Sequence, residues 1–98
     1  MKYTYAVLGG GRQGTAAAYD MAKFGDAKEV LIADIDGLAA EASADRVNTL
    51  VNRRAASAVK LDVTDGGALE AFLAGVDSFL SAVPYWLNPA ITEAAIRA

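Results

Sequence analysis

A cluster of glycines constrains this chain more than any other feature of its sequence. The run YAVLGGGRQG, residues 5–14, places four glycines within six residues directly after an apolar segment. Gly9, Gly11 and Gly14 fit the pattern G-x-G-x-x-G. A glycine inside a regular element costs roughly 0.5–1 kcal/mol relative to alanine. We therefore expect that backbone without side chains is needed at this point of the fold.

Strand-like and helix-like segments alternate along the rest of the chain. Short apolar runs predict strands over 3–8, 28–34, 56–61 and 76–83. Helix-forming composition predicts helices over 12–24, over about 37–52, in a short segment ended by Gly75, and from Asn88-Pro89 onward. Gly25 stands where the first helix should end. The expected N-terminal caps are Asp36 for the second helix and either Thr64 or Asp65 for the third.

This alternation predicts an α/β fold, a Rossmann-type doubly wound parallel sheet of four strands with helices on both faces. Right-handed crossovers leave few topologies, and the strand order 3-2-1-4 is the one that binds dinucleotides. The usual fold adds two more strands beyond the fourth. We therefore expect residues 1–98 to be a truncated, partial dinucleotide-binding domain, with the substrate domain absent from this chain.

The position of the glycine loop, after a strand and at the start of a helix, predicts a cradle for a pyrophosphate. Gly9 would allow the tight turn, Gly11 the close approach of the phosphates, and Gly14 close packing of helix on sheet. The helix N-terminus offers unpaired N–H groups and about half a positive charge. Arg12 and Gln13 lie in the first turn, where the Arg12 side chain either contacts the phosphates or points into solvent. The alternative is a plain strand-to-helix turn.

Asp34 ends the second predicted strand, twenty residues after Gly14. Such folds place an acid there to accept hydrogen bonds from the adenosine ribose hydroxyls. A carboxylate would repel a 2′-phosphate, and no basic residue follows before Arg46. The sequence therefore favours NAD as cofactor over NADP. The alternative role for Asp34 is to cap the next helix, which Asp36 fits better.

Two later strand ends are also candidates for the cofactor site. Asp62 would reach the adenine amino group and Val63 would pack near the ring, although Asp62 is alternatively a turn residue only. The small residues over 81–84 would let the chain pass close to the middle of the cofactor. Tyr85 and Trp86 follow, and we expect them at a domain interface, with the nicotinamide side as the alternative.

Composition excludes several classes of function. The chain has neither cysteine nor histidine, so it lacks a disulfide, a thiol nucleophile, the usual general base and the commonest metal ligand, and we expect no metal site. Its net charge of −3 and lack of a basic stripe argue against a nucleic-acid partner. No apolar stretch reaches the ~20 residues that cross a bilayer. Without a secretion signal, a cytoplasmic location without a membrane partner is expected.

The segments VLGGGRQG, LIADID, KLDVTD and SAVPYWLNPAITEAAIRA together resemble the N-terminal NAD(P)-binding domain of the saccharopine dehydrogenase family, in its lysine 6-dehydrogenase and saccharopine dehydrogenase-like branch. The resemblance covers essentially the whole chain, and its specific part is 81–98. It implies an oxidoreductase that acts on CH–NH donors. A hydride would leave the carbon that bears nitrogen in an amino acid, giving an imine that water hydrolyses.

The resemblance also implies which residues contact the cofactor, namely Gly9, Gly11, Arg12, Gln13, Gly14, Asp34, Asp62, Val63, Ala82, Val83 and Pro84. The substrate-binding and acid–base residues of that family lie mostly in a later domain, so no catalytic residue is assigned in this chain. We therefore expect the chain alone to bind cofactor without turnover, and the full-length enzyme to be a homodimer.

A different class of protein fits some of the same residues. Regulatory nucleotide-binding domains of potassium transport systems also use a G-x-G-R-x-G loop, an acid after strand two and an aspartate after strand three. Those domains are ligand switches and usually carry acidic polar residues after strand four, where this chain has PYWL over 84–87. A third alternative is an enzyme of the same fold with another substrate, an imino-acid reductase or a short-chain dehydrogenase, although the latter spaces its glycines differently.

Overall fold

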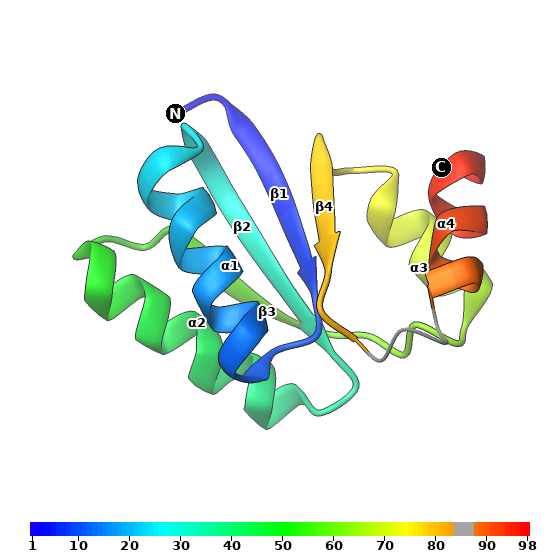
Figure 1. Ribbon diagram of the computed structural model, residues 1–98, viewed down its shortest axis with the longest axis horizontal. Coiled ribbons are helices and arrows are strands. Elements are labelled where there is room, and N and C mark those ends of the chain that lie inside the picture. Colours follow the sequence, from blue (N-terminus) through cyan, green and yellow to red (C-terminus); the bar gives the residue numbers. More distant parts are fainter. Residues whose placement is uncertain (84–87) are drawn as a thin grey trace.

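The computed structural model describes residues 1–83 and 88–98 of the 98-residue chain, without the side chain of Asn88. Four strands alternate with four helices among these residues (Figure 1). The elements in chain order are β1 (Tyr3–Leu8), α1 (Gly11–Phe24), β2 (Ala27–Asp34), α2 (Gly37–Val51), β3 (Ala56–Lys60), α3 (Gly66–Leu73), β4 (Ser78–Ser81) and α4 (Asn88–Arg97). No described helix combines the length and apolarity that crossing a bilayer requires.

The strands form one parallel sheet in the order β3-β2-β1-β4, which confirms the predicted topology. The register places Leu8 of β1 opposite Ala33 of β2 and Ser81 of β4, and Asp34 opposite Lys60 of β3. All four strands therefore end along the same edge of the sheet. The loops that follow them gather at that edge, where ligands bind in open α/β sheets.

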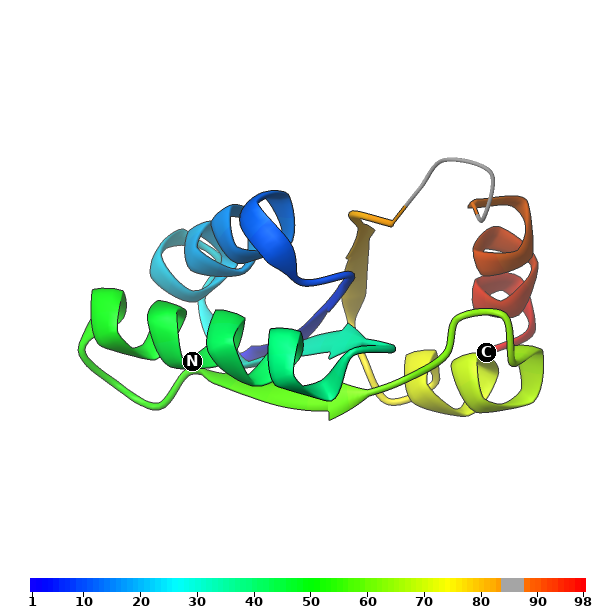
Figure 2. The same ribbon diagram turned by 90° about the horizontal axis from the view of Figure 1, so that it is seen from below.

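The two faces of the sheet carry different helices, with α1 and α2 on one face and α3 and α4 on the other (Figures 1 and 2). Side chains alternate along a strand, so Val7 joins the core beneath α1 and α2 while Leu8 joins the core with α3 and α4. Helix α1 buries only small residues, Gly14, Ala18 and Ala22, at four-residue spacing. These residues let its axis approach the sheet closely. The predicted doubly wound α/β fold is thus confirmed.

The end of α1 differs in detail from the prediction. Gly25 caps the helix, but its φ of −93° is one that any residue adopts, and the left-handed residue is Asp26 at φ 52°. Glycine is needed at 25 for space, because a Cβ there would lie 2.7 Å from the carbonyl oxygen of Met21 and 3.1 Å from the ring of Tyr5. The Tyr5 hydroxyl donates to the Gly25 carbonyl at the same point.

The fourth strand is shorter than the predicted 76–83. Regular pairing covers only Ser78–Ser81, and single hydrogen bonds continue on either side, from the N–H of Asp77 to Thr4 O and from the N–H of Ala82 to Leu8 O. Strand β4 lies at the end of the sheet order and pairs only with β1 among the described strands. Val76 and Val83 follow the apolar pattern because they pack on the core of α3 and α4, not because they lie in the strand.

The helix starts follow the predicted cap residues where their side chains are described. Asp36 caps α2 by accepting hydrogen bonds from the N–H groups of Leu38 and Ala39, at 3.0 and 3.2 Å. Asp65, one of the two predicted alternatives, caps α3 through the N–H of Ala68. The predicted cap at Asn88 concerns a side chain that lies outside the described residues. Both described caps fix the path of the chain where it leaves the edge at which the strands end.

Candidate functional site

The glycine loop joins β1 to α1 through backbone that L side chains rarely adopt. Gly9 and Gly11 have φ values of +99° and +71°, in the region that favours glycine. The N–H of Gly9 donates to Ala33 O at 2.7 Å, which ties the turn to the end of β2. A Cβ on Gly14 would lie only 2.0 Å from the carbonyl oxygen of Gly9. The first turn of α1 therefore rests directly on the loop, whereas the sequence predicts for Gly14 close packing against the sheet, where Cγ1 of Val7 would lie 3.5 Å from the same Cβ.

The outer side of this loop is open. No atom lies within 4 Å of the point where a Cβ of Gly11 would stand. The N–H groups of Gly11, Arg12 and Gln13 begin the helix, and they have no partner outside it among the residues that the structure describes. Three unpaired donors beside an open backbone, at the positive end of a helix dipole, fit the phosphates of a dinucleotide.

Asp34 stands beside the loop with both carboxylate oxygens in use. Its Oδ2 accepts the N–H of Gly10 at 2.7 Å and its Oδ1 accepts the N–H of Asp36 at 2.9 Å. The side chain is half-buried and forms no ion pair with any described residue. Each carboxylate oxygen has a second lone pair, so the fixed carboxylate can still accept a hydrogen bond from a ligand hydroxyl.

A cleft of about 310 Å³ opens at the edge where the four strands end. This volume is at the lower end of the range for small-molecule sites. Its lining residues are Gly9, Gly10, Ala33, Asp34, Ile35, Leu61, Asp62, Val63, Thr64, Ala82 and Val83. Apolar side chains form its walls, and the charged residues among those lining it are both acidic, Asp34 and Asp62. Lys60 does not line it and instead places its side-chain carbons about 3.7 Å from the point where a Cβ of Gly37 would stand.

Asp62 forms a local turn at the rim of the cleft. Its Oδ1 accepts hydrogen bonds from the Thr64 hydroxyl at 2.6 Å and from the Thr64 N–H at 2.9 Å. These two bonds, the side-chain bond first, favour the ionised carboxylate and lower the pKa of Asp62 from its ordinary value. Asp62 thus forms a turn and also lines the cleft, and its contact with the adenine amino group stays a prediction.

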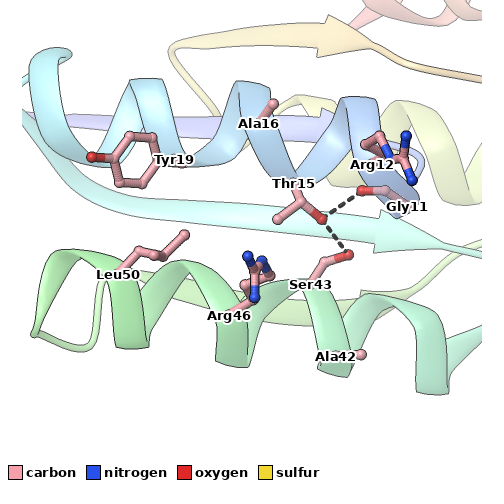
Figure 3. Close-up of a pocket in the computed structure, with 9 residues that line it drawn as sticks. All are labelled: Gly11, Arg12, Thr15, Ala16, Tyr19, Ala42, Ser43, Arg46 and Leu50. Atoms are coloured by element: carbon pink, nitrogen blue, oxygen red, sulfur yellow. Dashed lines mark hydrogen bonds between the residues drawn. The ribbon is translucent and has the colours of Figure 1, made fainter.

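A second and larger cavity of about 490 Å³ lies between α1 and α2 (Figure 3). It extends along the helices away from the strand ends, from Gly11 and Arg12 past Ser43 and Arg46 to Tyr19 and Leu50. We refer to it as the α1–α2 groove. Arg12 and Arg46 form no hydrogen bond or ion pair with the residues that the structure describes. The groove meets the cleft region only at the glycine loop, so the smaller cleft is the better candidate for the nucleoside.

Six of the residues named from the sequence meet in the cleft, namely Gly9, Asp34, Asp62, Val63, Ala82 and Val83. Gly11 and Arg12 line the α1–α2 groove, Gln13 is exposed in the first turn of α1, and Gly14 is buried beneath the loop. Pro84, Tyr85 and Trp86 lie outside the described residues. The sequence reasoning missed Gly10, Ala33, Ile35, Leu61 and Thr64, which the cleft also includes. Each is a direct sequence neighbour of a residue that had been named, so extending each named position by one residue on either side would have found them.

Comparisons with known proteins agree with this architecture. Residues 5–98 match the family described as the saccharopine dehydrogenase NADP binding domain. Quinate dehydrogenase from Corynebacterium glutamicum, solved in complex with NAD, is similar with a TM-score of 0.71 and 30% identity over 84% of this chain. Apo saccharopine dehydrogenase (L-Glu forming) from Saccharomyces cerevisiae has a TM-score of 0.70 and 28% identity over 98% of this chain. The chain spans 27% and 20% of the lengths of these two proteins, respectively. No curated protein sequence gives a significant match.

Proposed function

The chain belongs to the family of saccharopine dehydrogenase NADP-binding domains, and from that premise we propose that it binds NAD in preference to NADP as the cofactor domain of an amino-acid oxidoreductase. The observation that carries this proposal is the hydrogen bond of 2.7 Å from the N–H of Gly10 to Asp34 Oδ2. This bond joins the loop proposed to bind the phosphates to the acid proposed to bind the ribose. One local arrangement thus serves both the pyrophosphate and the adenosine of the cofactor.

The pyrophosphate is proposed to lie against the start of α1. The N–H groups of Gly11, Arg12 and Gln13 are unpaired among the described residues, and the position of a Gly11 Cβ is free of other atoms. Anions bind such helix ends through direct hydrogen bonds and through the helix dipole. The side chain of Arg12 extends from the same turn, and its guanidinium, which has no partner among the described residues, is available for a charged contact with the phosphates.

The adenosine is proposed to occupy the cleft of about 310 Å³. Leu61 and Val63 offer apolar surface to the adenine, and Asp34 accepts from the ribose hydroxyls. A 2′-phosphate would bring a second negative group beside this carboxylate, and no arginine or lysine is among the described residues that line the cleft. Repulsion between the two anions favours NAD, whatever the cofactor of other family members.

The hydride chemistry belongs to the nicotinamide, which accepts a hydride when the cofactor is bound. This chain contributes binding and orientation, through the loop that fixes the phosphates and the strand ends that fix the adenosine. We place the residues that bind an amine-bearing substrate outside this domain, because the chain spans only a fifth of saccharopine dehydrogenase. The matches to quinate dehydrogenase and to saccharopine dehydrogenase have similar TM-scores and identities. A hydroxy acid is therefore the second candidate for the hydride donor.

Fluorescence titration with NADH and NADPH tests the cofactor assignment. NADH is expected to bind the chain at least tenfold more tightly than NADPH, while amino acids added with NAD to the chain alone produce no NADH. Tighter binding of NADPH would overturn the preference, and binding of neither would overturn the proposal for this domain. An assay of the parent protein with amino acids against hydroxy acids separates the two donor classes.

A further inference from the structure

Two hydroxyl groups connect α1 to α2 directly behind the glycine loop. Thr15 Oγ1 donates to the carbonyl oxygen of Gly11, one turn earlier in α1, and lies 2.9 Å from Oγ of Ser43 on α2 (Figure 3). Because Thr15 has a single hydroxyl proton, its donation to Gly11 leaves Ser43 to supply the proton of the second bond. The bonds thus form a chain from Ser43 through Thr15 to the first residue of the helix.

Ser43 is only 5% exposed. Among the residues that the structure describes, it is the single buried polar one. A buried hydroxyl that lost its partner would be destabilising, so its place in α2 is tied to the Thr15 contact. The remainder of the buried face of α2 consists of Ala40, Ala44 and Val47. A polar residue among these apolar ones indicates that the hydrogen bond to Thr15, and not packing alone, determines which residue stands at this position.

Ser43 also stands against the loop itself. The point where a Cβ of Gly10 would lie is 3.1 Å from Ser43 Oγ and 3.2 Å from Asp34 Oδ2. Gly10 is therefore held between α2 and the end of β2, with its N–H bonded to Asp34. Contacts on both sides of Gly10 restrict the backbone that leads into Gly11.

We infer that Ser43 and Thr15 are positioning residues for the cofactor phosphates, forming a hydroxyl latch that fixes the loop with its N–H groups directed outward. The inference rests on the proposed binding of a dinucleotide. Donors that are already fixed lose less conformational freedom when an anion binds, so the affinity for a pyrophosphate is higher than with a mobile loop. Neither hydroxyl needs to touch the cofactor for this effect.

Two variants remove the latch with little change in volume. Ser43→Ala removes one hydroxyl, and Thr15→Val replaces a hydroxyl by a methyl group and removes both bonds. Each is expected to weaken NADH binding by about 3–10-fold, the range for one or two hydrogen bonds. The double variant is expected to bind no more weakly than Thr15→Val alone, because the second change removes a bond that is already lost.

The controls separate positioning from general loss of structure. Thr15→Ser keeps the hydroxyl and should restore NADH affinity to within about twofold of the original chain. Tyr19→Phe removes a hydroxyl from the far end of the same α1–α2 groove, where it accepts from Lys23, and should change nothing. Adenosine, which has no phosphate, should bind the latch variants as it binds the unchanged chain.

A measurement without ligand makes the test independent of cofactor binding. The ¹⁵N order parameters of Gly10 and Gly11 should fall in Ser43→Ala and Thr15→Val and remain unchanged in Tyr19→Phe. Unchanged order parameters, unchanged NADH affinity in the latch variants, or equal weakening for adenosine would each overturn the latch. Failure of the original chain to bind NADH would instead overturn the proposed function, and the order parameters would still decide whether the latch orders the loop.

Discussion

The backbone N–H of Gly10 lies 2.7 Å from Oδ2 of Asp34 and donates a hydrogen bond to it. The two residues are 24 positions apart in the sequence and meet because β1 and β2 are neighbours that end at the same edge of the sheet. The carboxylate is thereby held in one orientation before any ligand arrives. Its other oxygen accepts the N–H of Asp36, so it is restrained from both sides.

Asp34→Asn should reduce the discrimination between the two nicotinamide dinucleotides. The amide keeps one acceptor oxygen but removes the negative charge, so NADH should bind about 10–100-fold more weakly, the range for a hydrogen bond to a charged group. NADPH should lose less affinity or gain some. Titration of both cofactors measures the ratio. Asp36→Asn is the matched control, since asparagine is also a good helix cap and the charge lost lies outside the cleft. An equal change in the ratio of NADH to NADPH affinity in that variant would contradict the role of Asp34.

Alanine at two positions of the glycine loop should have different consequences. Gly14→Ala should prevent folding or strongly destabilise it, because the new Cβ would lie 2.0 Å from the Gly9 carbonyl oxygen. Gly11→Ala meets no atom within 4 Å, so the chain should fold with a loss of about 1 kcal/mol from its left-handed φ of +71°. Its methyl group would occupy the space proposed for the pyrophosphate and should abolish NADH binding.

Thermal unfolding followed by circular dichroism, with NADH titration, distinguishes these effects. Gly66→Ala is the control, because this helical glycine also has no atom within 4 Å of its Cβ position and no left-handed φ. It should raise the stability only slightly, because Gly66 is the first residue of α3 and not in its interior, and it should leave binding unchanged. If Gly11→Ala bound NADH as well as Gly66→Ala does, the phosphates would not lie at the loop.

Much of this fold could be predicted because its signals are local. The glycine spacing, the caps at Asp36 and Asp65 and the apolar runs each act within a few residues, and the handedness of crossovers then determines the strand order. The residues of the cleft followed from that order, since parallel strands bring Asp34, Asp62 and Ala82 to one edge.

The contacts between helices could not be predicted in this way. The bond between Thr15 and Ser43 joins positions 28 apart, and nothing in their neighbouring residues indicates that two hydroxyls meet. The left-handed conformation falls on Asp26, and the need for glycine at 25 comes from the nearby ring of Tyr5, which is distant in the sequence. The short β4 depends on its place at the end of the sheet order, a tertiary property that the apolar run over 76–83 does not contain.

Asn48 should contribute strongly to stability because its amide connects α2 to the start of β3. Its Oδ1 accepts from the N–H groups of Ala55 and Ala56, at 2.8 and 2.7 Å, and its Nδ2 donates to Ala56 O at 2.9 Å. Asn48→Ala leaves the buried N–H and C=O of Ala56 without these partners, while the N–H of Ala55 keeps its bond to Arg53 O at 3.1 Å, so the free energy of unfolding should fall by about 2–4 kcal/mol. Asn52→Gly removes an exposed amide and keeps the left-handed backbone, so it should be nearly neutral in the same urea unfolding experiment.

The ionisation of Asp62 should depend on Thr64. The hydroxyl of Thr64 is the larger cause of the lowered pKa and its N–H the smaller, so Thr64→Val should raise the pKa of Asp62 without restoring the ordinary value. A pKa lowered by folding means that the ionised turn stabilises the native state above the unfolded pKa, and that this stabilisation is lost as the pH falls through the folded pKa. The stability difference between Thr64→Val and the original chain should therefore be present at neutral pH and shrink in acid. Titration of the Asp62 carboxyl carbon by NMR measures the pKa directly. Thr64→Ser keeps the hydroxyl and should titrate like the original chain, whereas an unchanged pKa in Thr64→Val would assign the lowered value to another cause.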